Sequence, residues 1–137
     1  HKMELQRVAL TLELASGLIM VRGDTNQLQQ AMLNLIFNAI EAMPDGGGLA
    51  ISTRTDASGE QVTIEVKDTG YGIPAANLDH IYDPFFSTKA PGEGTGLGLS
   101  IVYGIIKNHG GRVKVKSTVN RGTIFSLRLP MYTGESA

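Results

Sequence analysis

Residues 31–43, AMLNLIFNAIEAM, form an apolar stretch that carries two asparagines one helical turn apart. At 100° per residue, the polar side chains of this segment and of the residues just before it share one stripe roughly 80° wide. This stripe consists of Gln27, Gln30, Asn34, Asn38 and Glu41. The opposite side consists of Leu28, Met32, Leu35, Ile36, Ala39 and Met43. The sequence therefore predicts an amphipathic helix with a carboxamide face.

Helix propensity does not explain the asparagines of the carboxamide face, because asparagine is a poor helix former. Leu33, Phe37 and Ile40 widen the apolar arc, so we expect most of the helix to be buried. Two interpretations are then open. Either neighbouring backbone satisfies the amides, which is the ordinary outcome, or the amides face solvent through a narrow slot or face a polar ligand.

Capping residues mark both ends of this helix. Asp24 is a suitable N-cap, and Gln27, three residues later, can return the contact as in a capping box. Pro44 and the glycines at 46–48 stop the helix. We therefore expect it to run from about residue 25 to about residue 43.

Alternating apolar residues predict strands on both sides of the helix. Val8, Leu10, Leu12 and Leu14 alternate with smaller or polar residues, which is the pattern of a half-buried strand. Two hairpins are expected later in the chain, because turn-rich segments separate pairs of short strand-like runs. The runs are residues 49–55 and 62–67 for the first hairpin, and residues 113–116 and 123–129 for the second.

Between the two hairpins, glycine and proline interrupt the pattern from residue 68 to residue 96. Only residues 75–81 look helical within this stretch. A loop of this length in a compact domain is usually functional or disordered. Residues 97–108 then regain a helical period, and Gly110 and Gly111 close it. An antiparallel or mixed sheet covered on one face by helices satisfies this order of elements.

The length and composition of the chain limit the classes of protein to which it can belong. The 137 residues suffice for one domain with a single core. A net charge of −1 favours neither nucleic acid nor an acidic membrane as a partner, and the absence of cysteine excludes disulfides and thiolate chemistry. No apolar stretch approaches the roughly 18 residues that span a bilayer, and no signal peptide opens the chain. We therefore expect a cytoplasmic domain, or a cytoplasmic piece of a larger protein.

The three histidines are His1, His80 and His109. Their scatter along the sequence argues against a metal cluster. We expect them to be surface or structural residues.

Two glycine-rich motifs lie in the interrupted region. Residues 68–73, DTGYGI, place a carboxylate at the end of a strand, before glycines that permit close backbone approach, although a simple turn also fits. Residues 92–99, GEGTGLGL, open a helix whose N-terminal amides can hold an anion. This second motif is not a dinucleotide fingerprint, because no strand precedes it and no acidic residue follows about 20 positions later. It is not a Walker loop either, because the chain has no Gly-Lys pair.

In combination, four motifs resemble the ATP-binding domain of sensor histidine kinases, part of the superfamily shared with gyrase and mismatch-repair ATPases. The N box is matched by residues 34–39 (NLIFNA), the first glycine box by 68–73, the F box by 83–89 (DPFFSTK) and the second glycine box by 94–99 (GTGLGL). The last two boxes and residues 103–111 are most similar to the nitrogen-regulation type of sensor kinase.

This resemblance implies the fold in more detail than the pattern alone. It implies a single α/β (α+β) two-layer sandwich over residues 1–137, with a mixed, mostly antiparallel sheet of about five strands. About three helices are expected on one face, together with a mobile ATP lid at about residues 83–96.

The resemblance also gives the carboxamide face a role. In the family, the residue that matches Asn38 coordinates Mg²⁺ between the phosphates, and a carboxamide oxygen is a suitable hard ligand for that ion. The position that matches Asn34 is a glutamate in the superfamily's ATPases, where it acts as general base on water. An amide cannot take that proton, which favours phosphotransfer over hydrolysis.

For the nucleotide base, the resemblance implies that Asp68 accepts a hydrogen bond from the adenine amino group. Gly70 and Gly72 would then let the ring approach the backbone. Thr123 matches a threonine that helps to hold adenine, although an ordinary strand threonine is a strong alternative.

For the phosphates, the resemblance implies a contact from Lys89 and backbone amides from the second glycine box. Phe85 and Phe86 either pack the lid against the domain or dock on the phosphoacceptor domain. The implied ATP-binding positions not yet named are Ile73, Gly94, Thr95, Gly96, Leu97, Gly98 and Leu99.

The implied function is binding of Mg-ATP and transfer of the γ-phosphate to a histidine of a separate helical dimerisation domain, in two-component signalling with a response regulator. None of the three histidines has the setting of a phosphoacceptor, so we expect the acceptor upstream of His1. We expect this domain to be monomeric and to contact neither nucleic acid nor membrane, whether or not the parent protein is membrane-anchored. Alternatives are an ATPase or serine kinase of the same superfamily, and a nucleotide-binding regulatory module without chemistry.

Overall fold

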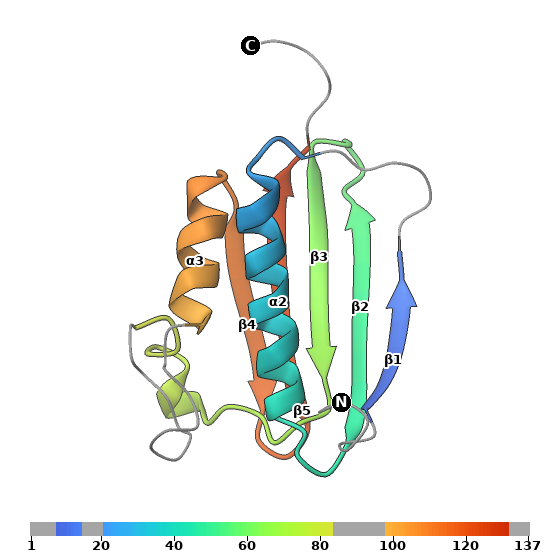
Figure 1. Ribbon diagram of the computed structural model, residues 1–137, viewed down its shortest axis with the longest axis vertical. Coiled ribbons are helices and arrows are strands. Elements are labelled where there is room, and N and C mark those ends of the chain that lie inside the picture. The colour runs from blue at the N-terminus through green and yellow to red at the C-terminus, as the bar shows by residue number, and fades with distance from the viewer. Residues whose placement is uncertain (1–7, 15–20, 84–97, 132–137) are drawn as a thin grey trace.

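The structure is a computed structural model that describes residues 8–14, 21–83 and 98–131. Its strands are β1 (Val8–Glu13), β2 (Gly47–Thr55), β3 (Gln61–Asp68), β4 (Arg112–Thr118) and β5 (Gly122–Pro130). Its helices are α2 (Thr25–Glu41), α3 (Gly98–Asn108) and a short 3₁₀ helix, Ala75–Asn77. The two α-helices lie side by side on one face of the sheet, which gives the expected two-layer sandwich (Figure 1).

The five strands form one sheet in the order β1-β2-β3-β5-β4. β1 pairs with β2 in parallel, and the other three pairings are antiparallel. The prediction of a mixed, mostly antiparallel sheet is therefore confirmed. Both predicted hairpins form, although each strand is longer by one to two residues at its ends than the alternation indicated.

The N-terminus of α2 confirms Asp24 as the N-cap but leaves the predicted capping box half formed. The Asp24 carboxylate accepts a hydrogen bond from the backbone N–H of Gln27 at 3.1 Å. The backbone N–H of Asp24, however, donates to Nε2 of His109 at 3.0 Å. A residue at the far end of α3 therefore takes the place that the Gln27 side chain was expected to fill. At the other end, α2 stops at Glu41, two residues earlier than predicted.

The core lies between the helix pair and the sheet. Leu35 of α2, Val102 and Ile106 of α3, and Phe125 and Leu127 of β5 are almost completely buried. Burial of these side chains supplies the main driving force for the packing of the two layers.

The prediction that most of α2 is buried is wrong for its outer side. Leu33 and Phe37 are 46% and 58% exposed, whereas Ile40 is 4% exposed. The helix rests on the sheet with one side and on α3 with a second, so its outer side faces away from the sheet (Figure 1). Helical periodicity shows how wide an apolar arc is, but not how much of it other elements cover.

The first strand forms where the alternation predicted it, but its burial was predicted incorrectly. Leu10, Leu12 and Leu14 are 51%, 55% and 62% exposed. β1 is an edge strand, and neither helix of the described chain reaches over it (Figure 1). Alternation therefore identified the strand and its faces, while the position of the strand in the sheet decided its exposure.

The predicted helix at residues 75–81 is shorter and of a different type. Ala75–Asn77 form a 3₁₀ helix, and turns continue to Asp83. The backbone bonds span three residues, as from the Leu78 N–H to the Ala75 carbonyl at 3.2 Å. Ile81 is nevertheless buried, so this segment is held against the domain by its apolar side chain.

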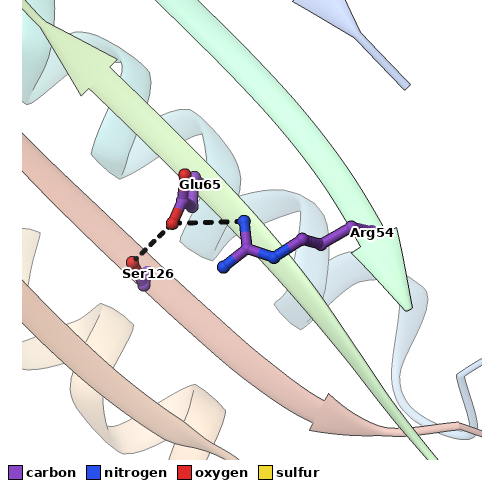
Figure 2. A network of polar contacts seen from close by, with 3 residues as sticks. All are labelled: Arg54, Glu65 and Ser126. Carbon is purple, nitrogen blue, oxygen red and sulfur yellow. Dashed lines mark hydrogen bonds and ion pairs between the residues drawn. The ribbon is translucent and has the colours of Figure 1, made fainter. Parts of the chain in front are cut away.

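The sheet face opposite the helices carries polar side chains from adjacent strands. Figure 2 shows Glu65 of β3 between Arg54 of β2 and Ser126 of β5. The Glu65 carboxylate lies 3.3 Å from Nη1 of Arg54 and accepts a hydrogen bond from the Ser126 hydroxyl at 3.4 Å. Among the described residues, no helix combines the length and apolarity that a membrane span requires.

Candidate functional site

A polar row crosses three adjacent strands at one end of the sheet. Asp68 of β3 pairs with Thr123 of β5, and Thr123 pairs with Ser117 of β4. The three side chains share the helix-covered face, because residues directly opposite one another in paired strands point to the same side. Asp68 and Thr123 are only 3% and 4% exposed. The row therefore places three oxygen-bearing side chains where the register would otherwise continue the apolar core.

The Asp68 carboxylate is held by backbone donors. Its Oδ1 accepts a hydrogen bond from the Gly70 N–H at 2.9 Å, and the Thr123 N–H donates to the same carboxylate group. Burial raises the pKa of Asp68 above its ordinary value, and these two hydrogen bonds oppose that rise. Within the described residues, no Lys or Arg forms an ion pair with Asp68. A buried acceptor of this kind is suited to a ligand that donates hydrogen bonds.

Three contacts fix the hydroxyl of Ser117, a residue that the sequence did not single out. Its Oγ accepts from the Ile73 N–H at 2.7 Å, donates to the Gly122 carbonyl at 3.0 Å and lies 2.7 Å from Thr123 Oγ1. Ser117 ends an alternating run, VKVKS, in which a serine is an ordinary strand residue. Only its register with Thr123 and Asp68 distinguishes it, and no local signal could have identified it.

The segment that follows Asp68 is held between two other segments of the backbone. The Tyr71 N–H donates to the Ala42 carbonyl at 3.0 Å, and the Asn120 N–H donates to the Tyr71 carbonyl at 2.8 Å. A Cβ on Gly70 would lie 2.4 Å from the Ala42 oxygen, and one on Gly72 would lie 2.3 Å from the Thr118 oxygen. Close backbone approach at both glycines is therefore present, but with the protein's own chain.

The carboxamide face of α2 points toward the start of α3. The Gln30 side-chain amide donates to Asn34 Oδ1 at 2.7 Å, and Nδ2 of Asn34 donates to the Gly98 carbonyl at 3.3 Å. Asn34 and Asn38 are both half-buried. For Asn34 the ordinary interpretation therefore holds, because a neighbouring side chain and a backbone carbonyl satisfy its amide. That carbonyl belongs to the last glycine of the predicted second glycine box.

Figure 1 shows that these parts meet at one end of the molecule. The C-terminal ends of α2, β3 and β4 and the first residues of α3 and β5 all lie there. Asn38 lies in the last turn of α2, Asp68 is the last residue of β3 and begins the DTGYGI segment, and Thr123 is near the start of β5. Asn34, in the middle of α2, is linked to the first residue of α3 by its bond to the Gly98 carbonyl. Gly98 and the half-buried Leu99 open α3 beside them.

Several predicted residues lie outside the described part of the chain. These are the phenylalanines of the F box and five predicted phosphate-side positions. They are Phe85, Phe86, Lys89, Gly94, Thr95, Gly96 and Leu97. Most of the predicted lid at residues 83–96 lies there too, so the structure describes the base side of the predicted site and only the beginning of its phosphate side.

The two described histidines have structural contacts. Both ring nitrogens of His109 are engaged, by the Asp24 N–H at 3.0 Å and by the Ile105 carbonyl at 2.7 Å. His80 lies 3.1 Å from the Asp83 carboxylate at the surface. No group of three or more His, Cys, Asp or Glu side chains gathers as a metal site in the ranges the structure describes.

Comparison with a family model matches residues 23–133 to the histidine kinase-, DNA gyrase B- and HSP90-like ATPases. Among curated relatives, the chain is 43% identical over 136 residues to "Sensor kinase CckA" of Brucella abortus, covering 90% of this chain and 14% of that protein. It is 47% identical over 112 residues to "Sporulation kinase C" of Bacillus subtilis, covering 82% of this chain and 25% of that protein. The chain therefore spans a quarter or less of these relatives.

Solved structures agree with the family model. The catalytic domain of histidine kinase ThkA is similar with a TM-score of 0.81 and 32% identity, over 94% of this chain and 84% of that one. Full-length ShkA in complex with AMPPNP is similar with a TM-score of 0.84 and 27% identity, over 98% of this chain and 28% of that one. The chain therefore belongs to the family of histidine kinase-, DNA gyrase B- and HSP90-like ATPases, and it is an ATP-binding domain of the histidine-kinase type.

Proposed function

We propose that this domain binds Mg-ATP and donates the γ-phosphate to a histidine of a separate helical dimerisation domain. One observation above all supports the proposal: a buried Asp68 carboxylate, held by backbone N–H groups, lies beside Thr123 at the end of the molecule where the carboxamide face of α2 meets α3. No Lys or Arg of the described residues pairs with this carboxylate. A buried acceptor of this kind is costly to keep, which is expected of a ligand-binding group rather than of a stabilising one.

In this proposal, Asp68 accepts from the adenine amino group, and Gly70, Gly72, Ile73 and Thr123 line the base side. In this proposal the phosphates lie over the N-terminus of α3, because the backbone N–H groups in the first turn of a helix suit anions. The phosphate-side residues are Lys89, Gly94, Thr95, Gly96, Leu97, Gly98 and Leu99.

We assign Mg²⁺ to Asn38 within the same proposal. The described residues offer no carboxylate cluster, so an ion held here takes its ligands mainly from phosphates and water, which is the usual arrangement for Mg²⁺. The half-buried carboxamide of Asn38 supplies one oxygen ligand. Bound there, Mg²⁺ would neutralise phosphate charge, while Asn38 would hold the ion on the α2 side of the nucleotide.

The state of Asn34 favours phosphotransfer over hydrolysis. Its carboxamide is engaged as acceptor from Gln30 and as donor to the Gly98 carbonyl. An amide has no proton-accepting group for activating water. An ATPase or serine kinase of the same superfamily and a regulatory module without chemistry are the competing functions, and steady phosphate release by the isolated domain would favour the ATPase.

Partners follow from the same proposal. The acceptor histidine is expected on a helical dimerisation domain of the same protein, and a response-regulator receiver domain would take the phosphate from it. We expect the isolated domain to be a cytoplasmic monomer. The similarity of the F box, the second glycine box and residues 103–111 to the nitrogen-regulation type stays a prediction, since the relatives described above carry other names.

The first experiment is calorimetric titration of the domain with ADP and with a non-hydrolysable ATP analogue, each with and without Mg²⁺. Asn38→Ala should remove most of the Mg²⁺-dependent gain in affinity, while Asn26→Ala, on the outer side of the same helix, should not. The full-length protein with Mg-ATP should form acid-labile phosphohistidine. Absence of nucleotide binding would reject the proposal as a whole, and binding without phosphohistidine would leave the regulatory module.

A further inference from the structure

The hydroxyl group of Ser117 has three hydrogen-bond partners but only one proton to donate. Oγ lies 2.7 Å from the Ile73 nitrogen, 3.0 Å from the Gly122 oxygen and 2.7 Å from Thr123 Oγ1. The Ile73 N–H can only donate, and the Gly122 carbonyl can only accept. A serine hydroxyl has one proton and two acceptor lone pairs.

These constraints determine the direction of every bond. The single proton of Ser117 goes to the Gly122 carbonyl, so Ser117 can only accept from its other two partners. Thr123 must therefore donate its own hydroxyl proton to Ser117. What Thr123 Oγ1 presents to the remaining space around it is lone pairs only, so Thr123 acts there as an acceptor.

Asp68 lies directly opposite Thr123 in the β3–β5 register. When ionised, its carboxylate is also an acceptor, so two acceptors then stand side by side on the helix-covered face. Two adjacent acceptors suit an amino group, which has two hydrogens, or a water that donates to both. They oppose a carbonyl oxygen, because lone pairs would then face lone pairs.

We propose that Ser117 is a positioning residue that sets base selection: by holding the Thr123 hydroxyl as an acceptor, it makes the site prefer a 6-aminopurine nucleotide to a 6-oxopurine one. The inference rests on the proposed function, because it places the base at Asp68. Ser117 itself does not touch the base. Its bond to the Ile73 N–H additionally fixes the end of the DTGYGI segment against β4.

Removal of the Ser117 hydroxyl should do more than remove its hydrogen bonds to the backbone of Ile73 and Gly122. In Ser117→Ala, the Thr123 hydroxyl loses its acceptor and is free to turn its proton toward the ligand. A 6-oxo group then gains a donor, while a 6-amino group loses an acceptor. The ratio of affinities for the two purines changes, whereas a purely structural role would weaken both nucleotides alike.

The test is calorimetric titration of the domain with ADP and with inosine 5′-diphosphate. The wild type should prefer ADP. Ser117→Ala should lower the ADP-to-IDP affinity ratio roughly tenfold, because ADP loses about one hydrogen bond and IDP gains about one. Ser117→Thr keeps a hydroxyl on a strand-compatible residue and should preserve the ratio. Ser126→Ala, on the opposite face of the neighbouring strand, is the matched control and should also preserve it.

The outcomes separate the inference from the proposed function. Wild-type binding to neither nucleotide overturns both. Wild-type binding to ADP with an unchanged ratio in Ser117→Ala overturns the role of Ser117 and leaves the nucleotide site. If Ser117→Ala does not fold, Ser117→Cys tests the same point, because a thiol is a weak donor and a weak acceptor; an unchanged ratio in that variant likewise overturns the inference.

Discussion

Nε2 of His109 accepts a hydrogen bond from the backbone N–H of Asp24 at 3.0 Å, so the end of α3 is tied to the beginning of α2. The other ring nitrogen, Nδ1, lies 2.7 Å from the Ile105 carbonyl, to which it donates. This fixes the neutral tautomer with its proton on Nδ1. The ring also packs against Gly23, where an added Cβ would lie 2.2 Å from the ring carbon Cδ2.

His109→Ala should lower the free energy of unfolding by about 1–2 kcal/mol, because two hydrogen bonds and the ring packing are lost. Denaturant unfolding measures this effect. His80→Ala, at an exposed histidine beside Asp83, should change stability by less than about 0.5 kcal/mol. Gly23→Ala should destabilise the wild type more than it destabilises His109→Ala, since the clash requires the imidazole. Additive effects would show that the ring does not pack there in solution.

Asp68→Asn should stabilise the ligand-free domain at neutral pH while removing nucleotide binding. Because burial raises the pKa of Asp68, its protonated form favours the folded state. The stability contributed by Asp68 is therefore fully present below pH 3.8, the ordinary value, and is lost as the pH rises through the raised pKa. The neutral asparagine escapes this loss but offers the base a different pattern of donors and acceptors.

Thermal unfolding without nucleotide and titration with ADP measure the two effects, and Asp45→Asn, in the exposed turn after α2, is the control. When the pH is lowered, the affinity of the wild type for ADP should begin to fall before the pH reaches 3.8. With its raised pKa, Asp68 takes up a proton above this pH and then no longer accepts a hydrogen bond there. A lower melting temperature for Asp68→Asn at neutral pH would contradict this account.

Two glycine-to-alanine substitutions should change the free energy of unfolding in opposite directions. Gly72 has a φ of 76°, and a Cβ there would meet the Thr118 oxygen at 2.3 Å. Gly72→Ala should therefore destabilise by about 3 kcal/mol. Gly104, inside α3, has nothing within 4 Å of an added Cβ, so Gly104→Ala should stabilise by about 1 kcal/mol through helix propensity. Chemical denaturation of both variants measures the difference, and equal effects would refute the packing argument.

Tyr82→Phe should leave stability unchanged or raise it by about 1 kcal/mol. The buried Tyr82 hydroxyl has no hydrogen-bond partner within the described ranges, and burial together with nearby Tyr103 raises its pKa to about 12. Removing an unsatisfied buried hydroxyl costs little, and the ring contact with Tyr103, at 5.0 Å between centroids, survives in phenylalanine. Tyr103→Phe is the control at a more exposed tyrosine. A loss of more than about 1 kcal/mol in Tyr82→Phe would show that the Tyr82 hydroxyl has a partner in solution.

The parts of the fold that sequence predicted correctly depend on local rules. Asp24 caps α2 because its side chain reaches a backbone N–H three residues away. Alternation identified each strand of the described residues because the side-chain period is a local property. The capping box failed in its second half because His109, 85 positions along the chain, supplies the competing acceptor. The exposed fractions of Leu33 and Phe37 likewise depend on which other elements of the fold cover that side of α2, and helical periodicity carries no information on this coverage.

The candidate site divides in the same way. Asp68 was identified because it ends a strand and begins a recognisable motif. Ser117 was missed because its role depends on register, and register depends on which strands pair. The sequence left Thr123 open between a site residue and an ordinary strand residue, and its role at the site stays a prediction, although it is buried beside Asp68. Whether these side chains hold a base is a separate question, which the titrations address.

The two edges of the sheet differ in how they would behave in a concentrated solution. The outer strand β4 carries exposed Arg112, Lys114 and Lys116, and such charges discourage the pairing of one sheet edge with another. The opposite outer strand, β1, carries exposed leucines at positions 10 and 12 and no Lys or Arg. Any aggregation of the purified domain should therefore begin at β1, and replacing Leu12 by lysine should raise the solubility limit without changing the candidate site around Asp68.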